Sequence, residues 1–342
     1  MKKRLQAFCL MLLTFMAVQA QEEAIAVLSH EGSTKTFSGR EALKQAYAEA
    51  THGDLVTLSS GQFEAVNIEK AITIRGAGLG VDETYGTQPT VIYNNFYIGI
   101  SDNTDHHFQL EGIFHDGTIS YRSNQLNSQF VKCRLNTLTR AEYEETGGTK
   151  VYGTCRGMSI TQCKITGGLT CGANSTISVW NSYVFNPSTI SKENSNFSIT
   201  NCVVIGYAAS IYGSYLTNSI IYRNSSKGGT INYNDRTTFS NCLLCGVTAP
   251  DTDKNTYTTF SKLDGVFKTY TGNYSELETF ELRDDAKELY LGTDGTEVGM
   301  YGGVVPYTPR LAGPHISVFS VSPRASSDGK LSVRLQVDTT LE

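Results

Sequence analysis

Side chains that could bind or transform a ligand gather around one long loop of this chain. Arg122 and Lys150 are cations that pair with carboxylates, Arg through two parallel hydrogen bonds and Lys as a point charge. Tyr152 offers a flat apolar ring with a polar tip, which suits a sugar ring. Glu142 and Glu144 lie in the loop itself and add hydrogen-bond acceptors. These residues predict a site for a polymer that carries carboxylates, such as an acidic polysaccharide.

A second candidate set shares one position of a repeated pattern. Arg134, Lys164 and Tyr183 each directly follow a Cys or Ser, and alternation points each of them outward. Two cations and an aromatic ring in a row could track an anionic glycan, and the alternative is an ordinary solvated sheet face. Further along, the same position holds apolar residues, which indicate cover by a loop, a terminal segment or a partner protein: Val203, Ile220 and Leu243.

The pattern consists of an apolar residue, a Cys or Ser three positions on, one outward residue and a second apolar residue. The steps between the Cys or Ser positions are 30, 19, 20, 17 and 23 residues. A period near 20 predicts a solenoid, in which each repeat buries its apolar face only against its neighbours. The copies are Phe130-Cys133-Leu135, Ile160-Cys163-Ile165, Val179-Ser182-Val184, Ile199-Cys202-Val204, Leu216-Ser219-Ile221 and Phe239-Cys242-Leu244.

The residue before the Cys or Ser indicates the kind of solenoid. In one copy, Phe197 and Ile199 face inward, and after Asn201 the inward phase restarts at Cys202. This skip requires a bend, and Asn is among the non-glycine residues that best tolerate the left-handed conformation. Stacked amides would then hydrogen-bond along successive bends. A third strand in each coil is indicated by a further apolar series: Leu169, Ile190, Ile211 and Ile231.

Three short strands per coil of about 20 residues, with an Asn bend between two of them, resemble the right-handed parallel β-helix of the pectin-lyase-like superfamily. The resemblance spans residues 37–302. Its last part, FELRDDAKELYLGTDGTEVGMYGG, resembles the segment that closes secreted β-helix proteins of Bacteroidetes-like bacteria. The expected fold class is all-β, a parallel solenoid with an amino-terminal capping helix and a carboxyl-terminal β-hairpin.

The resemblance also implies a mechanism for the loop residues. In the superfamily's lyases, the sheet with overhanging loops carries the substrate and a Lys or Arg base. Aligning Val151 with Leu169 places Lys150 outward on that sheet, with Tyr152 beside it and Arg122 one coil earlier. Lys150 or Arg122 would then take the proton next to a uronate carboxylate, and no cofactor or metal is expected. The superfamily also contains adhesins and inert scaffolds, so a non-catalytic surface or adhesive scaffold is the alternative.

Seven of the eight cysteines lie beyond the amino-terminal apolar run, and several share the inward position of the repeat. They predict a stack of buried thiols, although coils about 4.8 Å apart would also allow a disulfide between Cys133 and Cys163. The pair Cys242 and Cys245 has the spacing of a metal motif but lacks a second pair. The histidine-rich stretch from Asp102 to Asp116 allows a metal or acid/base site, with a polar loop as the alternative.

The chain is expected to be exported. Residues 1–20 have the pattern of a cleaved signal peptide, with Lys2, Lys3 and Arg4 before an apolar run too short for a membrane span. Removing these three of the 28 basic residues leaves 25 against 33 acidic residues, a net charge of −8, which disfavours nucleic acid as a partner. The mature protein would be secreted, periplasmic or at the cell surface. Its partner would be a polysaccharide or glycan, or a surface protein.

The signal peptide precedes three further segments. Residues 21–36 are an N-terminal segment, and residues 37–302 are expected to form the β-helix domain with its cap. The capping helix should cover residues 38–50, and Ser38 with Glu41 has the spacing of a capping box. Residues 303–342 contain two alternating runs around Asp328-Gly329, which predict a hairpin that caps the domain or serves as a docking tail.

Overall fold

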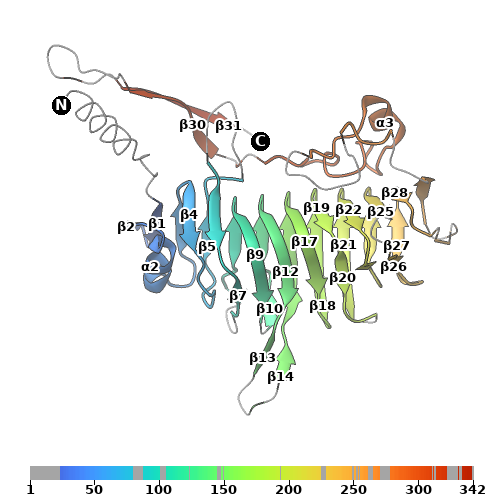
Figure 1. Ribbon diagram of the computed structural model, residues 1–342, viewed down its shortest axis with the longest axis horizontal. Coiled ribbons are helices and arrows are strands. Elements are labelled where there is room, and N and C mark those ends of the chain that lie inside the picture. Colours follow the sequence, from blue (N-terminus) through green and yellow to red (C-terminus); the bar gives the residue numbers. More distant parts are fainter. Residues whose placement is uncertain are drawn as a thin grey trace, which may run out of the picture.

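The computed structural model describes residues 24–79, 88–100, 105–122, 124–144, 148, 150–192, 194–224, 229–248, 250, 251, 253, 255–260, 265–269, 278–309, 311, 313–321, 330 and 333–340. Their regular secondary structure is mainly β-strand, wound into a right-handed parallel solenoid (Figure 1). The expected fold class is therefore confirmed. No helix in this part of the chain combines the length and the apolar character needed to cross a membrane.

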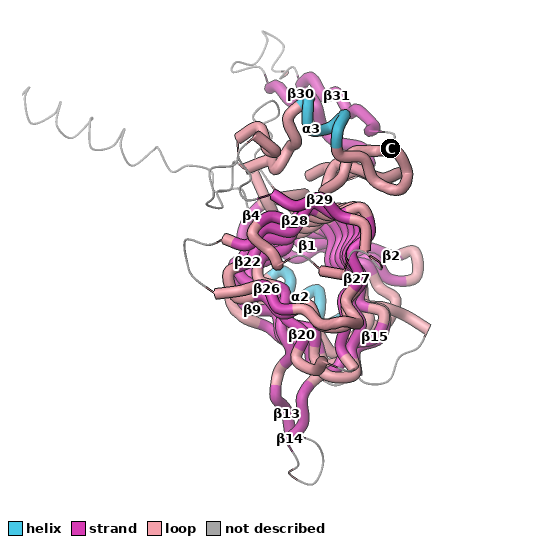
Figure 2. The backbone as a smooth tube through the Cα atoms, turned by 90° about the vertical axis from the view of Figure 1, so that its right-hand side faces the viewer, coloured by secondary structure: helices cyan, strands magenta, loops and turns pink. Residues whose placement is uncertain are grey.

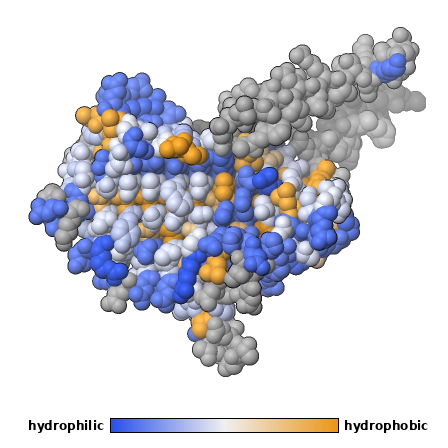
Figure 3. Space-filling view, turned by 180° about the vertical axis from the view of Figure 1, so that it is seen from behind, coloured by the Kyte–Doolittle hydropathy of each residue, from blue (hydrophilic) through white to orange (hydrophobic). Residues whose placement is uncertain are grey.

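The coils contribute strands to three faces around the solenoid axis, along which Figure 2 looks. Sheet A lies on the side that Figure 3 shows and consists, in spatial order, of β2 (Ser33–Ser38), β1 (Ile25–His30), β3 (Leu55–Leu58), β5 (Thr73–Arg75), β8 (Gln109–Glu111), β11 (Gln129–Val131), β16 (Met158–Thr161), β18 (Ser175–Trp180), β21 (Ser195–Thr200), β24 (Tyr215–Thr217) and β27 (Thr238–Ser240). Sheet B consists of β29 (Tyr257–Phe260), β28 (Cys242–Cys245), β25 (Ile220–Arg223), β22 (Val203–Gly206), β19 (Tyr183–Phe185), β17 (Lys164–Cys171), β12 (Arg134–Arg140), β9 (Phe114–Tyr121), β6 (Thr90–Tyr93) and β4 (Gly61–Glu64).

The third face is built by short strands and by the ends of three long ones. β9, β12 and β17 bend from sheet B into this face, where they join β7 (Phe96–Ile98), β20 (Pro187–Thr189), β23 (Ala209–Ser210) and β26 (Ile231–Asn232). A further parallel pair, β10 (Asn124–Leu126) and β15 (Thr154–Arg156), lies between the third face and sheet A. The inward side chains of all three faces form one continuous apolar core.

Each bend from sheet A to sheet B is made by one residue in the left-handed conformation. The φ angles of Gln162, Asn181, Asn201, Asn218 and Asn241 are 52°, 45°, 50°, 50° and 49°. Asn tolerates this conformation because its short polar side chain can hydrogen-bond locally. The predicted bend positions are confirmed.

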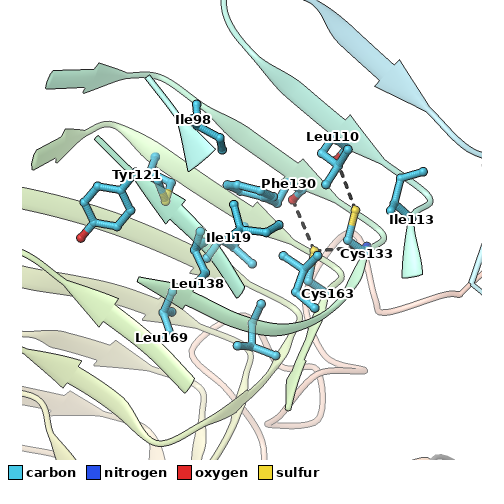
Figure 4. Packing of buried hydrophobic residues seen from close by; sticks show 14 of the residues in the cluster. Ile98, Leu110, Ile113, Ile119, Tyr121, Phe130, Cys133, Leu138, Cys163 and Leu169 are labelled. Atoms are coloured by element: carbon cyan, nitrogen blue, oxygen red, sulfur yellow. Dashed lines mark hydrogen bonds between the residues drawn. The ribbon is translucent and has the colours of Figure 1, made fainter. Parts of the chain in front are cut away.

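The Cys or Ser after each bend points into the solenoid. The side chains of Cys163, Ser182 and Ser219 each accept a hydrogen bond from a backbone N–H of the preceding coil, in place of a strand carbonyl. The backbone N–H of Cys163 donates to Ser182 Oγ at 2.9 Å, and that of Cys202 donates to Ser219 Oγ at 3.1 Å. Figure 4 shows the same relation one coil earlier, where the Cys133 N–H donates to Cys163 Sγ at 3.3 Å. The side chains donate in turn to nearby carbonyls, as Ser182 Oγ does at 2.6 Å. This ladder satisfies backbone groups that the bend removes from the sheets.

The cysteines among the described residues are all free and buried. The predicted stack of thiols is therefore confirmed, and the alternative of a disulfide between Cys133 and Cys163 is not realised. Burial raises the pKa of Cys202 and of Cys242 to about 12, and that of Cys155 to about 11. These thiols should carry almost no thiolate at neutral pH, and we expect them to be unreactive in the native protein.

Iodoacetamide at pH 8 should therefore leave Cys202 and Cys242 unmodified in the native protein and modify both after unfolding. Mass spectrometry of the labelled peptides measures this. Ser240→Cys provides the control, because residue 240 lies two positions before Cys242 on the outer side of sheet A and its thiol should react in native buffer. Rapid native labelling of Cys202 and Cys242 would contradict their inward position.

The apolar series expected to align on the third face, Leu169, Ile190, Ile211 and Ile231, does not align from coil to coil as expected. Leu169 pairs with Pro187 in the next coil, and Ala209 pairs with Ile231. Ile190 lies past the end of β20 and is 46% exposed, so it does not belong to the buried series. The connections between coils differ in length on this face, and apolar spacing alone does not fix the register across them.

The amino-terminal end is closed by a hairpin and a helix. β1 pairs antiparallel with β2 and with β3, which ends the parallel stack of sheet A. Helix α2 (Ala42–Glu49) buries the expected apolar stripe: Ala42, Leu43, Ala46 and Tyr47. The expected capping box is wrong, because Ser38 belongs to β2 and the N-cap residue Glu41 makes no side-chain capping bond.

The described residues 265–269 and 278–309 form a cover segment that runs back along sheet B, and it contains helix α3 (Asp284–Leu289). The closing segment expected from the sequence thus lies along the side of the solenoid (Figure 1). Its apolar side chains and the outward side chains of sheet B form a second buried cluster, separate from the core. The main members are Tyr183, Val203, Ile205, Ile220 and Leu243 from sheet B, and Phe267, Phe280, Leu282, Val298 and Met300 from the cover segment.

The side-chain amides of the Asn and Gln residues at the bends, called the bend amides below, attach the cover segment to the coils. Asn181 Nδ2 donates to the Met300 and Gly302 carbonyls at 3.2 and 2.6 Å. Gln162 Nε2 donates to the Pro306 carbonyl at 2.8 Å, and Asn218 Oδ1 accepts from a backbone N–H of the cover segment at 2.9 Å. The expected hydrogen bonds from one bend amide to the next do not occur among the described residues, because these amides face outward.

The carboxyl-terminal hairpin is confirmed. β30 (Gly313–Val321) pairs antiparallel with β31 (Val333–Thr340), and neither pairs with another described strand. The predicted turn residues Asp328 and Gly329 lie outside the described residues.

Candidate functional site

The insertion after Arg140 is a projecting β-hairpin. β13 (Glu142–Glu144) and β14 (Lys150–Tyr152) pair antiparallel, with Glu144 opposite Lys150 and Glu142 opposite Tyr152. Figure 1 shows this hairpin extending away from the coils. Because β12 ends at Arg140, the hairpin leaves the solenoid at the end of a third-face strand.

The expected alignment of Val151 with Leu169 is wrong. Leu138 of β12 lies opposite Leu169, whereas Val151 pairs with Tyr143 inside the hairpin. Lys150 therefore projects with the hairpin and does not lie on the third face. The inserted residues form an antiparallel pair of their own, and alternation alone does not distinguish such a pair from a coil strand.

Lys150 is held in an ion pair. Its Nζ lies 2.9 Å from Glu142 Oε1, and both side chains are exposed. The hydrogen bond from Lys150 to Glu142 raises the pKa of Lys150 and lowers the pKa of Glu142. Lys150 consequently keeps its proton at neutral pH, which disfavours the expected role as a general base.

Tyr152 is also engaged within the hairpin region. Its side chain is 50% exposed, and Arg140 Cζ lies 3.9 Å from its ring centroid. The Tyr152 hydroxyl donates to Glu142 Oε2 at 3.3 Å. The side chain of Glu144 lies outside the described part of the structure. The polar groups that the sequence assigned to ligand binding here are thus largely satisfied by one another.

Arg122 directly follows β9, beside the strand from which the hairpin leaves. Its Cζ lies 3.8 Å from the centroid of the Tyr97 ring. The Tyr97 hydroxyl donates to Glu69 Oε1 at 2.6 Å, and this bond raises the pKa of Tyr97. Arg122 forms no ion pair with a described residue, and its buried Nε has no hydrogen-bond acceptor there. The guanidinium is therefore oriented by an aromatic face, and no carboxylate of a described residue neutralises its charge.

The second candidate set lies largely beneath the cover segment. Tyr183 is 1% exposed and stacks on Phe280, with ring centroids 4.6 Å apart. Lys164 Nζ donates to a carbonyl of the cover segment at 2.9 Å. Arg134 Nη1 lies 3.0 Å from Asp116 Oδ1, and its side chain is 13% exposed. These contacts leave no continuous solvated row of the three side chains. The expected cover by a terminal segment is confirmed for Val203, Ile220 and Leu243.

The histidine-rich stretch is divided between the core and the surface. His115 is fully buried, and its Nδ1 lies 2.8 Å from the Ile92 carbonyl oxygen. The ring of His106 packs against Gly53, and Asp102 lies outside the described residues. Across the described ranges, no three His, Cys, Asp or Glu side chains are arranged to hold a metal ion.

Two surface features were missed by sequence reasoning. Tyr97, the partner of Arg122, occupies the outward position between Phe96 and Ile98, and that alternation could have identified it. Trp180 and Tyr215 lie on the outer side of sheet A and are 38% and 56% exposed. The only Trp of the chain stands at an outward position directly before a bend residue, which was the available signal.

Comparison with protein-family models, with curated proteins and with solved structures gave no match. The class of protein therefore follows from its architecture. It is a right-handed parallel β-helix with an antiparallel hairpin projecting from one coil and a terminal segment covering sheet B.

Proposed function

We propose that this β-helix protein is exported and binds an acidic polysaccharide without cleaving it, with Arg122 as the anchoring cation. The observation that carries the proposal is the state of the Arg122 side chain. It stacks on Tyr97, and no carboxylate among the described residues neutralises it. A planar guanidinium can bind a carboxylate through two parallel hydrogen bonds.

The surroundings of Arg122 favour binding because they limit its motion. Stacking on Tyr97 orients the guanidinium, and the hydrogen bond to Glu69 fixes the Tyr97 ring in turn. Less rotational freedom is then lost when a ligand binds. The hairpin beside Arg122 contributes a wall but no free cation, because Lys150 is paired with Glu142.

Non-catalytic binding is favoured over cleavage by the protonation of Lys150. A lyase base must accept a proton, and the ion pair with Glu142 raises the pKa of Lys150 instead. The proposal of export rests on the signal-peptide pattern of residues 1–20. The alternative function is that of a surface or adhesive scaffold.

Polygalacturonate tests the proposed site. By isothermal titration, Arg122→Ala should raise the Kd at least tenfold, or about 1.4 kcal/mol. Lys150→Ala should change it by less than about fivefold, because the exposed Lys150 charge is already paired with Glu142. Binding by the parent protein should weaken as salt is raised, since exposed charges are screened.

Arg75→Ala is the matched control, because Arg75 is an exposed arginine that pairs with Glu111 on another face, with Nε and Oε2 2.8 Å apart. Equal binding by the Arg122→Ala variant and the parent would remove Arg122 as the anchor. If the parent protein bound no acidic polysaccharide, the scaffold function would be favoured. Release of unsaturated uronate products by the parent would contradict non-catalytic binding.

A further inference from the structure

The outer side of sheet A is uncharged over β16, β18, β21, β24 and β27. Two outward positions per strand align in two parallel rows across these strands. The first row is Ser159, Ser178, Ser198, Tyr215 and Thr238, and the second row is Thr161, Trp180, Thr200, Thr217 and Ser240. Figure 3 shows this face with rows of pale colours of intermediate hydropathy across its middle, narrow orange bands between them, and darker blue groups toward its margins.

Trp180 and Tyr215 are the exposed aromatic residues of these two rows, at 38% and 56%. Trp180 pairs with Thr200, whereas Tyr215 pairs with Ser198, so the two rings lie two strands apart in different rows. With about 4.8 Å between strands and about 3.3 Å per residue along a strand, their Cα atoms are roughly 12 Å apart. Between them, Ser198 and Thr200 of β21 present only small hydroxyl groups.

We infer that this face binds a neutral polysaccharide chain that lies across the strands from Trp180 to Tyr215. Each ring offers an apolar face on which the C–H groups of a sugar ring can stack. The hydroxyl rows supply both donors and acceptors for sugar hydroxyls. The separation of the two rings exceeds one sugar unit, so they contact different units of one chain.

The absence of charge in the two rows selects a neutral ligand. A neutral glycan has no charged group to dehydrate when it contacts Ser and Thr. A uronate carboxylate would lose part of its hydration here without finding a cation to pair with. The polar face and its exposed aromatics also match the amphipathic character of a sugar, whose ring faces are apolar and whose edges carry hydroxyls. This site lies on a different face from Arg122 and does not depend on the proposed acidic-glycan site.

The double variant Trp180→Ala with Tyr215→Ala tests the inference, with cellohexaose and microcrystalline cellulose as probes. The parent protein should bind one or both, and the double variant should lose at least tenfold in affinity. Tyr215→Phe should retain binding, because stacking requires the ring and not its hydroxyl. Arg122→Ala should also bind these neutral probes normally, which separates this site from the proposed acidic-glycan site.

Leu289→Ala is the surface control, because Leu289 is 67% exposed on α3. Thermal unfolding establishes that the variants are folded. If Trp180→Ala with Tyr215→Ala is unstable, Trp180→Ser alone provides the test and should lose affinity at least threefold. Parent-like binding by the folded double variant would overturn the inference. Failure of the parent to bind either neutral probe would also overturn it, whatever the result with polygalacturonate.

Discussion

Replacing Phe280 by alanine should lower the free energy of unfolding by about 3–5 kcal/mol, the range for losing a buried phenylalanine side chain. Phe280 is 1% exposed between the cover segment and sheet B, where it stacks on Tyr183 and meets the Phe267 ring edge-on. Its φ angle of 57° lies in the left-handed region, which is unfavourable by about 1–2 kcal/mol for a bulky residue. The burial of the ring therefore offsets backbone strain as well as side-chain entropy. Chemical denaturation followed by circular dichroism measures the change.

Leu289→Ala is the control within the same segment, because Leu289 is exposed and alanine is a better helix former. The free energy of unfolding should change by less than about 0.5 kcal/mol. A loss below about 1 kcal/mol for Phe280→Ala would show that the cover segment does not stabilise the solenoid.

Asn181→Gly should lower the free energy of unfolding by about 1.5–4 kcal/mol. Glycine tolerates the left-handed conformation of the bend but costs about 0.5–1 kcal/mol in chain entropy. It also removes the buried amide that donates to the Met300 and Gly302 carbonyls, which adds about 1–3 kcal/mol. Chemical denaturation measures the change, and limited proteolysis should show faster cleavage of the cover segment.

Asn201→Gly is the matched control for this prediction. Asn201 has nearly the same φ angle and the same 6% exposure, but its buried Oδ1 has no hydrogen-bond partner among the described residues. Its replacement should therefore cost only about 0.5–1 kcal/mol, the chain-entropy part. Equal losses for the two variants would mean that the bend amides do not hold the cover segment.

The fold was predictable because the strongest sequence signals are local. The residue before each Cys or Ser, Asn in four of the six copies, interrupts the strand alternation, and the structure places these residues in the left-handed conformation. The inward thiols and hydroxyls follow from the same interruption, as the buried Cys163 and Ser182 illustrate. Such features depend only on neighbouring residues and on contact with the next coil.

The site was predicted poorly because its errors concern contacts between distant residues. Tyr183 and Lys164 were placed correctly on the outward side of sheet B, yet the cover segment lies against both. Their partners are about 100 residues away in the sequence, and periodicity carries no information about such contacts. Lys150 was correctly found exposed, but its pairing with Glu142 required the hairpin register.

The direction in which the cover segment runs has a consequence for how the chain folds. In a simple solenoid, contacts join neighbouring coils, so folding can begin anywhere and spread. Here the bonds from Asn181 to Gly302 and from Gln162 to Pro306 span 121 and 144 residues. Contacts of this length slow folding because a long loop must close before they form. The coils around Gln162 and Asn181 are therefore joined to the cover segment only after residues 302–306 have been synthesised.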